Sequence, residues 1–294
     1  MIRRVMSLLI ALSAVVAALV VLPAATAQAA ACANAWNASA VYTGGQSASY
    51  NGRNYTAKWW TQNERPGSSD VWADQGACGG GGGGGEQPSG FVVSEAQFNQ
   101  MFPNRNSFYT YSGLTAALSS YPAFANTGSD EVKKREAAAF LANVSHETGG
   151  LVHIKEVNEA NYPHYCDRNQ PYGCPAGQAA YYGRGPIQLS WNFNYKAAGD
   201  ALGIDLLNNP YLVEQNASVA WRTGLWYWNT QSGPGTMTPH NAIVNNRGFG
   251  ETIRSINGSI ECNGGNPAQV QSRIDKFTSF AQILGTTTGS NLYC

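Results

Sequence analysis

Charge is scarce in this sequence. Only 12% of the residues are Asp, Glu, Lys or Arg, and the 18 acidic residues balance the 18 basic ones. A chain without net positive charge has no field to hold a polyanion, so this composition argues against a nucleic-acid-binding protein. Aromatic residues, by contrast, reach 11%, and glycine occurs 33 times. This profile is typical of an exported protein that contacts neutral polymers.

Long apolar runs are absent beyond the N-terminus. No stretch after residue 21 approaches the ~20 apolar residues that span a bilayer. The run at residues 5–21 follows Arg3 and Arg4 and precedes Ala27-Gln28-Ala29, which fits the small-x-small rule for leader cleavage. We therefore expect a signal peptide at residues 1–29 and a secreted, extracellular protein. A membrane anchor is the alternative interpretation of this run.

The cysteines lack the paired Cys-x-x-Cys spacing of zinc sites. Six cysteines in an exported chain indicate disulfides, for which several pairings are possible. Two cysteines precede a glycine-rich segment and four follow it, so independent folding of the two parts forces the first pair. Of the other four, two close a short loop and the remaining two fasten the C-terminus. We expect the disulfides Cys32–Cys78, Cys166–Cys174 and Cys262–Cys294.

The glycine-rich segment is an uninterrupted glycine run at residues 79–85, continued by Glu86-Gln87-Pro88-Ser89-Gly90. A phosphate-binding loop would need a following Lys-Ser or Lys-Thr pair, which is absent. A flexible tether of this length reaches roughly 20 Å as a random coil. The sequence therefore predicts a first module at residues 30–78, a linker at 79–90 and a second domain at 91–294.

The first module is too small to be stable on a hydrophobic core alone, and it holds four of the eight tryptophans. Asn51-Gly52 separates residues 47–50 from residues 53–60, which predicts a two-residue β-hairpin. Side chains alternate along a strand, so Trp59 and Trp60 cannot both enter one core. Alternation selects Trp60 as exposed. A flat sugar ring stacks well on an indole, so we expect carbohydrate binding; an exposed tryptophan without a function is the alternative.

The module resembles the family 5/12 chitin-binding modules over Tyr50-Asn51-Gly52, Tyr55-Thr56-Ala57-Lys58-Trp59-Trp60-Thr61-Gln62 and residues 66–72. The resemblance implies a small three-stranded β fold whose exposed aromatic residues contact chitin. It assigns chitin binding to both Trp59 and Trp60, whereas alternation alone selects Trp60.

Helical signals dominate from Phe91 onward. Ser94-Glu95-Ala96-Gln97 is a capping-box pattern that opens a helix. A second helix is predicted from Ser129 to Glu147, where Gly149-Gly150 ends it. Residues 211–228 carry tryptophan and leucine at helical spacing and predict a third.

Two further helix starts are marked by proline. Thr238-Pro239 and Asn266-Pro267 each place a capping residue before a proline at the first helical position. The last helix is expected to bury Val270, Ile274 and Phe277. Because strand signals are sparse, the second domain is predicted to be mainly α.

Glu147 is the first candidate for chemistry. It follows Phe140 and Val144 on one stripe of its helix, which predicts an inward-facing carboxyl. An apolar environment favours the neutral carboxyl, and this suits a general acid; a capping or salt-bridged glutamate is the alternative. Glu156 lies beyond Gly149-Gly150, so the two carboxyls leave different elements and could face each other across a cleft. Inverting glycosidases need a gap of about 6.5–9.5 Å between them to hold a water.

Metal and serine-hydrolase chemistry lack their motifs. His146-Glu147 begins the zinc-protease pattern, but Gly150 occupies the position of the second histidine. The other histidines, His153, His164 and His240, show no ligand spacing, so we expect them to be structural. The Gly-x-Ser-x-Gly elbow is absent. The sequence therefore predicts neither a metal site nor a cofactor.

The most specific segment is Tyr182-Gly183-Arg184-Gly185-Pro186-Ile187-Gln188-Leu189-Ser190-Trp191-Asn192-Phe193-Asn194-Tyr195. It is a glycine-hinged loop dense in amide, hydroxyl and aromatic groups, which is the chemistry of a sugar cleft; a structural polar loop is the alternative. It also matches, without a gap, the signature of family-19 glycoside hydrolases. His146-Glu147-Thr148-Gly149-Gly150 and Asn257-Gly258 with Glu261-Cys262 match that family too. The whole chain thus resembles the secreted two-module chitinases of soil actinomycetes.

This resemblance implies a bilobal, lysozyme-like fold that cleaves β-1,4-linked N-acetylglucosamine by endo-acting attack and a single inverting step. By motif, Glu147 resembles the general acid and Glu156 the general base, although nearby Glu159 could be confused with it. Ser190 resembles the residue that helps to hold the attacking water. The short segment between the acids implies fewer subsites than in plant members. Substrate-cleft positions correspond to His146, Thr148, Gln188, Asn194, Asn257 and Arg273.

Two other functions are compatible with these motifs. A lysozyme-like scaffold also permits a muramidase, and a chitin lectin would bind without hydrolysis. The presence of both Glu147 and Glu156 argues against the lectin. We expect a monomer whose partners are chitin and chitooligosaccharides, with no nucleic acid and no membrane among them.

Overall fold

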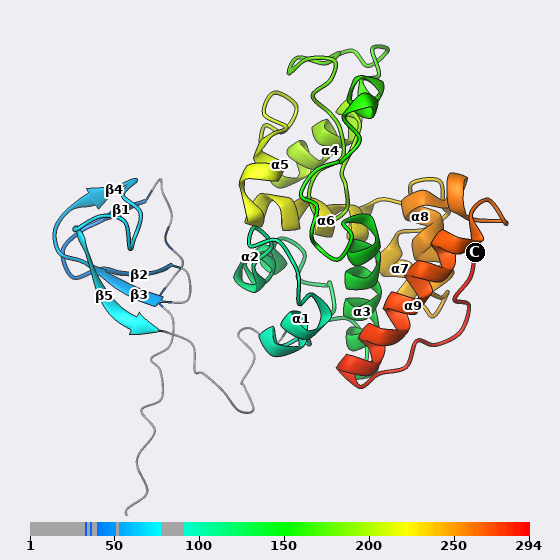
Figure 1. The fold of residues 1–294 in the computed structure, drawn as a ribbon, viewed down its shortest axis with the longest axis horizontal. Helices are drawn as coiled ribbons and strands as arrows, with labels where there is room; N and C mark the ends of the chain where they lie inside the picture. Colours follow the sequence, from blue (N-terminus) through cyan, green and yellow to red (C-terminus); the bar gives the residue numbers. More distant parts are fainter. Residues whose placement is uncertain (1–32, 34–35, 37–39, 51–52, 78–90) are drawn as a thin grey trace, which may run out of the picture. The chain divides into compact units, whose positions relative to one another are not determined.

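The structure, a computed structural model, describes residues 33, 36, 40–50, 53–77 and 91–294. It divides into two compact units, Met1–Gly85 and Glu86–Cys294 (Figure 1). The expected signal peptide, the Asn51-Gly52 turn, the Cys32–Cys78 disulfide and the linker lie outside the described residues and stay predictions.

The first unit is a small antiparallel β structure. The strands β2 (Ser47–Tyr50), β3 (Arg53–Ala57) and β5 (Trp72–Ala77) form one sheet in the order β2-β3-β5. The short strands β1 (Val41–Tyr42) and β4 (Thr61–Gln62) pair with each other. The register of β2 against β3 confirms the predicted hairpin pairing. The core consists of Ala48, Tyr55, Ala57, Val71 and Trp72.

Both tryptophans that follow β3 are exposed. The expected strand over residues 53–60 was too long, because β3 ends at Ala57 and the chain then bends. Strand alternation therefore does not apply to Trp59 and Trp60, whose exposed fractions are 56% and 60%. The expectation that Trp60 is exposed is confirmed, and Trp59, which alternation placed on the other face of the strand, is exposed as well. The ammonium group of Lys58 lies 5.9 Å from the centre of the Trp59 ring.

The second unit is helical, which confirms the predicted mainly α domain. The capping side chains predicted at Ser94, Ser129, Thr238 and Asn266 all accept a backbone N–H at a helix start. The α-helices are α1 (Glu95–Met101), α2 (Tyr111–Ala117), α3 (Asp130–Glu147), α4 (Asn192–Leu202), α5 (Leu212–Gln215), α6 (Ala217–Thr230), α7 (Pro239–Val244), α8 (Phe249–Glu261) and α9 (Pro267–Leu284), and the 3₁₀ helices are η2 (Leu118–Ser120) and η3 (Glu159–Tyr165).

One predicted helix is in fact two. The expected helix over residues 211–228 is broken at Asn216, whose backbone is extended, with φ −127° and ψ 110°. The Asn216 side chain accepts the backbone N–H of Val219 and so caps the start of α6. The tryptophan and leucine spacing that predicted the helix belongs to α6 alone.

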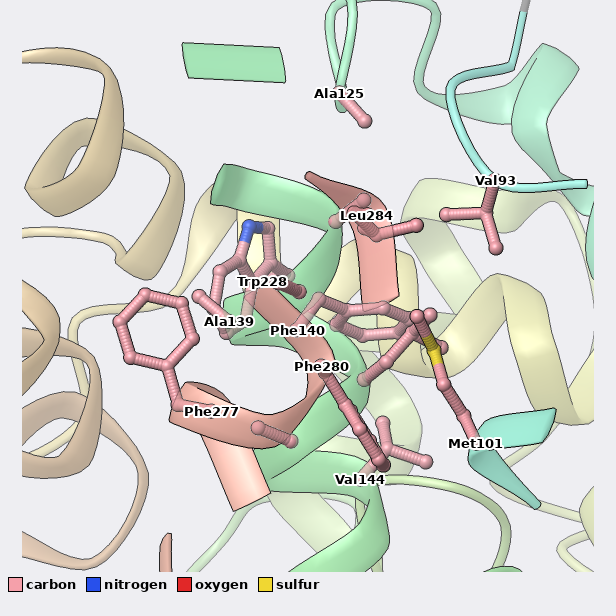
Figure 2. Packing of buried hydrophobic residues seen from close by; sticks show 14 of the residues in the cluster. Val93, Met101, Ala125, Ala139, Phe140, Val144, Trp228, Phe277, Phe280 and Leu284 are labelled. Carbon is pink, nitrogen blue, oxygen red and sulfur yellow. The ribbon is translucent and has the colours of Figure 1, made fainter. Parts of the chain in front are cut away.

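Helix α3 is the centre of this unit. Residues 136–145 are buried on all sides, so the predicted inward stripe is only part of the buried surface. Helix α9 packs along it, as Figure 1 shows. Figure 2 shows Phe140 and Val144 of α3 among Phe277 and Phe280 of α9 and Trp228 of α6. This packing fixes the C-terminal end of α3, where Glu147 lies.

Two hydrophobic cores form the unit, and α6 contributes to both. Trp221 and Trp228 pack in the core around α3. Trp226, on another side of α6, packs in a second core with Tyr181 and Tyr195. The presence of two cores agrees with the bilobal, lysozyme-like fold that the resemblance implied.

Two of the three expected disulfides fall within the described residues, and both are confirmed. Cys166 pairs with Cys174, and Cys262 pairs with Cys294. Among the described residues, no helix combines the length and the apolar character that crossing a membrane requires.

Candidate active site

Glu147 is the last residue of α3, and its side chain is 18% exposed. The helix stops here because Gly149 and Gly150 adopt φ values of 62° and 84°, which other residues rarely take. A Cβ at Gly149 would also lie only 3.2 Å from the His153 ring. A carboxyl thus emerges from a buried helix at the point where the chain turns away.

An arginine from α9 holds this carboxyl. The Arg273 side chain is 1% exposed, and its Nη2 donates to Glu147 Oε1 at 2.5 Å. The same guanidinium donates to Glu261 through Nε at 2.8 Å and Nη2 at 2.7 Å. Its Nη1 donates to Asn143 Oδ1 of α3 at 3.1 Å. The salt-bridged glutamate considered for Glu147 is therefore the arrangement that the structure shows.

Glu261 is a residue whose importance sequence reasoning missed. It was noted only as part of a motif, although it is 1% exposed and is the main partner of Arg273. Asn257 Nδ2 donates to its Oε1 at 2.8 Å, and Asn257 interrupts α8 with φ −144°. Burial acts to raise the pKa of Glu261, but the hydrogen bond and charge of Arg273 outweigh it and lower that pKa. Burial likewise acts to lower the pKa of Arg273, and the charge of Glu147 raises it overall.

His146 and Thr148 flank the acid and anchor it. The two ring nitrogens of His146 lie 3.2 Å from Ser272 Oγ and 2.7 Å from Gln269 Oε1, both on α9. Burial, followed by the charge of Arg273, lowers the pKa of His146, so the ring is neutral at pH 7. Thr148 is fully buried, and its hydroxyl donates to the Val144 carbonyl at 2.7 Å. The Thr148 hydroxyl is thus turned into the protein, which places it as a support for Glu147.

Glu156 lies in a separate hydrogen-bond network. Its backbone N–H donates to the Gly183 carbonyl at 2.8 Å, which joins it to the signature segment. Its Oε1 accepts hydrogen bonds from Asn161 Nδ2 at 2.7 Å and from the Tyr165 hydroxyl at 3.1 Å. Its Oε2 is buried without a partner among the described residues. Glu159, the neighbour that could be confused with it, has a side chain 74% exposed and pairs with Lys155 at 3.8 Å.

Ser190 and Gln188 lie on a tightly folded segment. Gln188 and Trp191 have φ values of 50° and 76°, which are costly for residues with a side chain and are often found at functional sites. The Gln188 Nε2 donates to the Gly185 carbonyl at 3.0 Å, and Ser190 Oγ donates to the Gln188 carbonyl at 3.2 Å. Asn194 Nδ2 donates to the Ser190 carbonyl at 2.9 Å, where α4 begins. All three predicted cleft residues of this segment remain partly exposed.

Buried Arg184 links several parts of this segment to one another and to Glu214. Its Nη1 donates to the Ala180 and Tyr182 carbonyls and to the Tyr195 hydroxyl, and its Nε pairs with Glu214 at 3.0 Å. Its guanidinium also lies 3.5 Å from the centre of the Tyr182 ring. The family signature thus contains its own scaffold, which sequence reasoning described only as a loop.

The predicted site residues fall into two networks. His146, Glu147, Thr148, Asn257 and Arg273 meet where α3, α8 and α9 converge. The segments that carry Glu156 and the Gln188–Asn194 residues are joined by backbone bonds. The two carboxyls share no hydrogen-bond partner in the described ranges. The Glu147 carboxyl lies in a charged environment, and the Glu156 carboxyl lies among neutral donors.

No metal site is found in the described part of the chain, where no three His, Cys, Asp or Glu residues are grouped closely enough to hold an ion. A large open hollow of about 680 Å³ lies against the C-terminal segment, lined by Arg247, Glu251 and residues 289–293. It contains none of the predicted site residues. The candidate site is therefore defined by its side-chain contacts.

Family models match both units. A model described as chitinase class I, glycoside hydrolase family 19, matches residues 92–294. A model of carbohydrate-binding module family 5/12 matches residues 35–73. Both families are those that the sequence motifs resemble.

Individual relatives are similar over most of the chain. Chitinase 4 of Oryza sativa subsp. japonica is 43% identical over 210 residues, which are 69% of this chain and 70% of the rice protein. The crystal structure of chitinase C from Streptomyces griseus HUT6037 is 82% identical and covers 90% of this chain and 100% of its own, with a TM-score of 0.69. A crystal structure of a chitinase C mutant, E147Q, matches with the same identity, coverage and TM-score.

Proposed function

Because this chain belongs to the class I chitinases of glycoside hydrolase family 19, we propose that it is a secreted, endo-acting enzyme that cleaves β-1,4 linkages in chitin with inversion. Chitinase activity and a chitin-binding module come with the two families. Endo action, inversion, export and the roles of individual residues are the proposed parts.

The contrast between the two carboxyl groups is the observation that supports the mechanism. Glu147 and Glu261 share one cation, Arg273. Arg273 is buried and donates two hydrogen bonds to Glu261 and one to Glu147. The hydrogen bond and charge of Arg273 lower the pKa of Glu261 and keep that residue ionised, and Glu147 is the carboxyl of the pair with the more exposed side chain. Glu147 is therefore the carboxyl of this cluster that can reach a substrate, and it is the general acid in our assignment.

Glu156 is the general base in the same assignment. Within the described residues its carboxylate has no cation beside it, and its hydrogen-bond donors are the neutral side chains of Asn161 and Tyr165. A base must accept a proton from water, and its Oε2 has no protein partner in the described residues. Ser190, on the segment joined to Glu156 by backbone bonds, helps to orient that water.

The proposed reaction is a single displacement. Glu147 donates its proton to the glycosidic oxygen of the leaving sugar as the C–O bond breaks. Glu156 takes a proton from the water, whose oxygen attacks the anomeric carbon from the opposite face. The β-linkage therefore gives an α-product, and proton exchange with solvent restores both carboxyls. Gln188, Asn194 and Asn257 present polar side chains for the substrate, while His146, Thr148 and Arg273 position the acid.

The test uses a soluble N-acetylglucosamine hexasaccharide. Proton NMR should detect the α-anomer first, and chromatography should show internal cleavage. Glu147→Gln and Glu156→Gln should each lose about 10²–10⁴-fold in kcat, the usual contribution of general acid–base catalysis, while substrate binding persists. Initial formation of the β-anomer, or a trapped glycosyl-enzyme, would refute inversion and the base assignment. Reducing ends released from peptidoglycan but not from chitin would indicate a muramidase instead.

The remaining organisation is proposed from the sequence. A signal peptide at residues 1–29 precedes the binding module at 30–78, the linker at 79–90 and the catalytic domain at 91–294. The disulfides Cys166–Cys174 and Cys262–Cys294 suit an oxidising, extracellular compartment. Trp59 and Trp60 form the proposed chitin-binding surface, and the enzyme acts as a monomer.

A further inference from the structure

The two oxygens of the Glu156 carboxylate have different surroundings. Oε1 accepts two hydrogen bonds, from Asn161 at 2.7 Å and from Tyr165 at 3.1 Å. Oε2 is buried, with no partner in the described residues. Buried polar atoms are nearly always hydrogen-bonded, so an unpartnered one calls for a functional explanation. Because both donors bind Oε1, Oε2 is the carboxylate oxygen that is left without a protein donor within the described ranges.

Tyr165 is itself held in place from several directions. It ends η3 and directly precedes the Cys166–Cys174 disulfide. The Asn192 side chain binds this disulfide loop by accepting from the Asp167 N–H and donating to the carbonyls of Asp167 and Gly173. The Trp191 ring lies edge-on to Tyr165, with ring centres 5.7 Å apart. These contacts hold the Tyr165 hydroxyl in place beside the Glu156 carboxylate.

Tyr165 is a permanent donor. Burial, then the charge and hydrogen bond of Glu156, raise the pKa of Tyr165 to about 12, so its hydroxyl keeps its proton across the working pH range. The nearby charges are already paired with one another, Lys155 with Glu159 and Arg184 with Glu214.

Tyr162, the other neighbouring hydroxyl, donates to the Glu156 backbone carbonyl at 2.9 Å and leaves the carboxylate alone. Glu147, the proposed acid, is held by Arg273 in its own network. Among the described residues, no cation therefore contacts the Glu156 carboxylate.

We propose that Tyr165 is a positioning residue for hydrolysis: together with Asn161 it holds Oε1 of Glu156, so that Oε2 takes the proton from the attacking water. The proposal rests on the assignment of Glu156 as the general base. Hydrogen bonds donated to a carboxylate favour its ionised form, which is the form a base needs. They also stop the carboxylate from rotating, which keeps Oε2 aimed at the water.

The pH dependence of kcat/KM on the soluble hexasaccharide tests this role in the full chain. Tyr165→Phe removes the hydroxyl and keeps the ring. We expect kcat at neutral pH to fall about ten-fold or more, with KM changed less than about two-fold, because the substitution keeps the ring that packs against Trp191. The acidic limb of the kcat/KM profile should move to higher pH by about half to one unit, because the Glu156 carboxylate loses the hydrogen bond that Tyr165 donates. The position of this limb does not depend on how much of the protein is folded.

A second variant and a matched control separate positioning from a structural effect. Asn161→Ala removes the other donor and should move the limb in the same direction. Tyr172→Phe also removes a tyrosine hydroxyl, but that hydroxyl lies in the disulfide loop and donates to Gln170, so its profile should match the wild type. An acidic limb that stays in place in both Tyr165→Phe and Asn161→Ala overturns the proposal. Full activity of Glu156→Gln would instead overturn the base assignment on which it rests.

Discussion

Replacing Glu261 by glutamine tests the charged network behind the proposed acid. The substitution keeps the size of the side chain and removes its charge. Glu261 accepts two hydrogen bonds from Arg273, at 2.8 and 2.7 Å, and both residues are 1% exposed. The amide also turns an –NH₂ group toward an arginine that can only donate.

The expected loss of stability follows from these two bonds. A hydrogen bond to a charged group contributes about 1.5–3 kcal/mol, and we take the lower figure because Arg273 keeps Glu147 as a partner. Two such bonds amount to about 3 kcal/mol in the free energy of unfolding. A domain of about 200 residues shifts its Tm by about 2–4 °C per kcal/mol. We therefore expect the catalytic unit of Glu261→Gln to melt about 6–12 °C lower at neutral pH.

Calorimetry across pH separates charge from packing. The pKa of Glu261 is lower in the folded state than in the unfolded one. The contribution of Glu261 to the free energy of unfolding is thus fully present above its pKa in the unfolded chain, about 4.3. It is lost as the pH falls through its pKa in the folded state. The Tm difference between wild type and variant should be largest at pH 7 and should narrow below about pH 4.

Glu251→Gln is the control, because it removes a carboxylate from the same helix. Glu251 pairs with Arg254 at 3.3 Å, and both side chains are 27% exposed. Such a pair contributes about 1 kcal/mol or less. A Tm difference for Glu261→Gln that equals the control, or that stays constant on acidification, would refute the stabilising charged network.

Two further predictions concern the first module. Trp60→Ala and Trp59→Ala should each weaken binding to insoluble chitin by about two- to ten-fold, since a stacked aromatic ring adds about 0.5–1.5 kcal/mol; hydrolysis of short soluble oligomers should not change, and an equal loss in both assays would mean that the rings are structural. Peptide mapping without reductant should recover a Cys32–Cys78 peptide, and a bridge from either cysteine to the second unit would contradict the pairing.

Four helix starts were predicted from the side chains that cap them, whereas the capped start of α6 at Asn216 was missed. Ser94, Ser129, Thr238 and Asn266 each satisfy a free backbone N–H, and such caps leave a local sequence signal. Helices α4 and α8 begin without a side-chain cap, at Trp191 with φ 76° and at Gly248 with φ 105°. Nothing local marks them, because tertiary packing sets these starts.

The candidate site was predictable as residue types but not as contacts. Resemblance identified Glu147, Glu156 and Arg273, and the structure joins Arg273 to Glu147 across 126 residues of sequence. Glu261 and Tyr165 escaped notice because their importance lies in what they touch. A buried glutamate beside an arginine has the same local sequence as an exposed one.

The sequence by itself determined the chemistry that is available: two families, two units, two confirmed disulfides and the carboxyl, amide and aromatic groups of the site. These follow from residue identity and short-range spacing, which the chain carries in one dimension. Only the tertiary structure decided how the carboxyls differ. It brings Arg273 and Glu261 to Glu147, and Tyr165 and Asn161 to Glu156. The protonation of a carboxyl depends on burial, nearby charge and hydrogen bonds, and these exist only once distant segments have packed together.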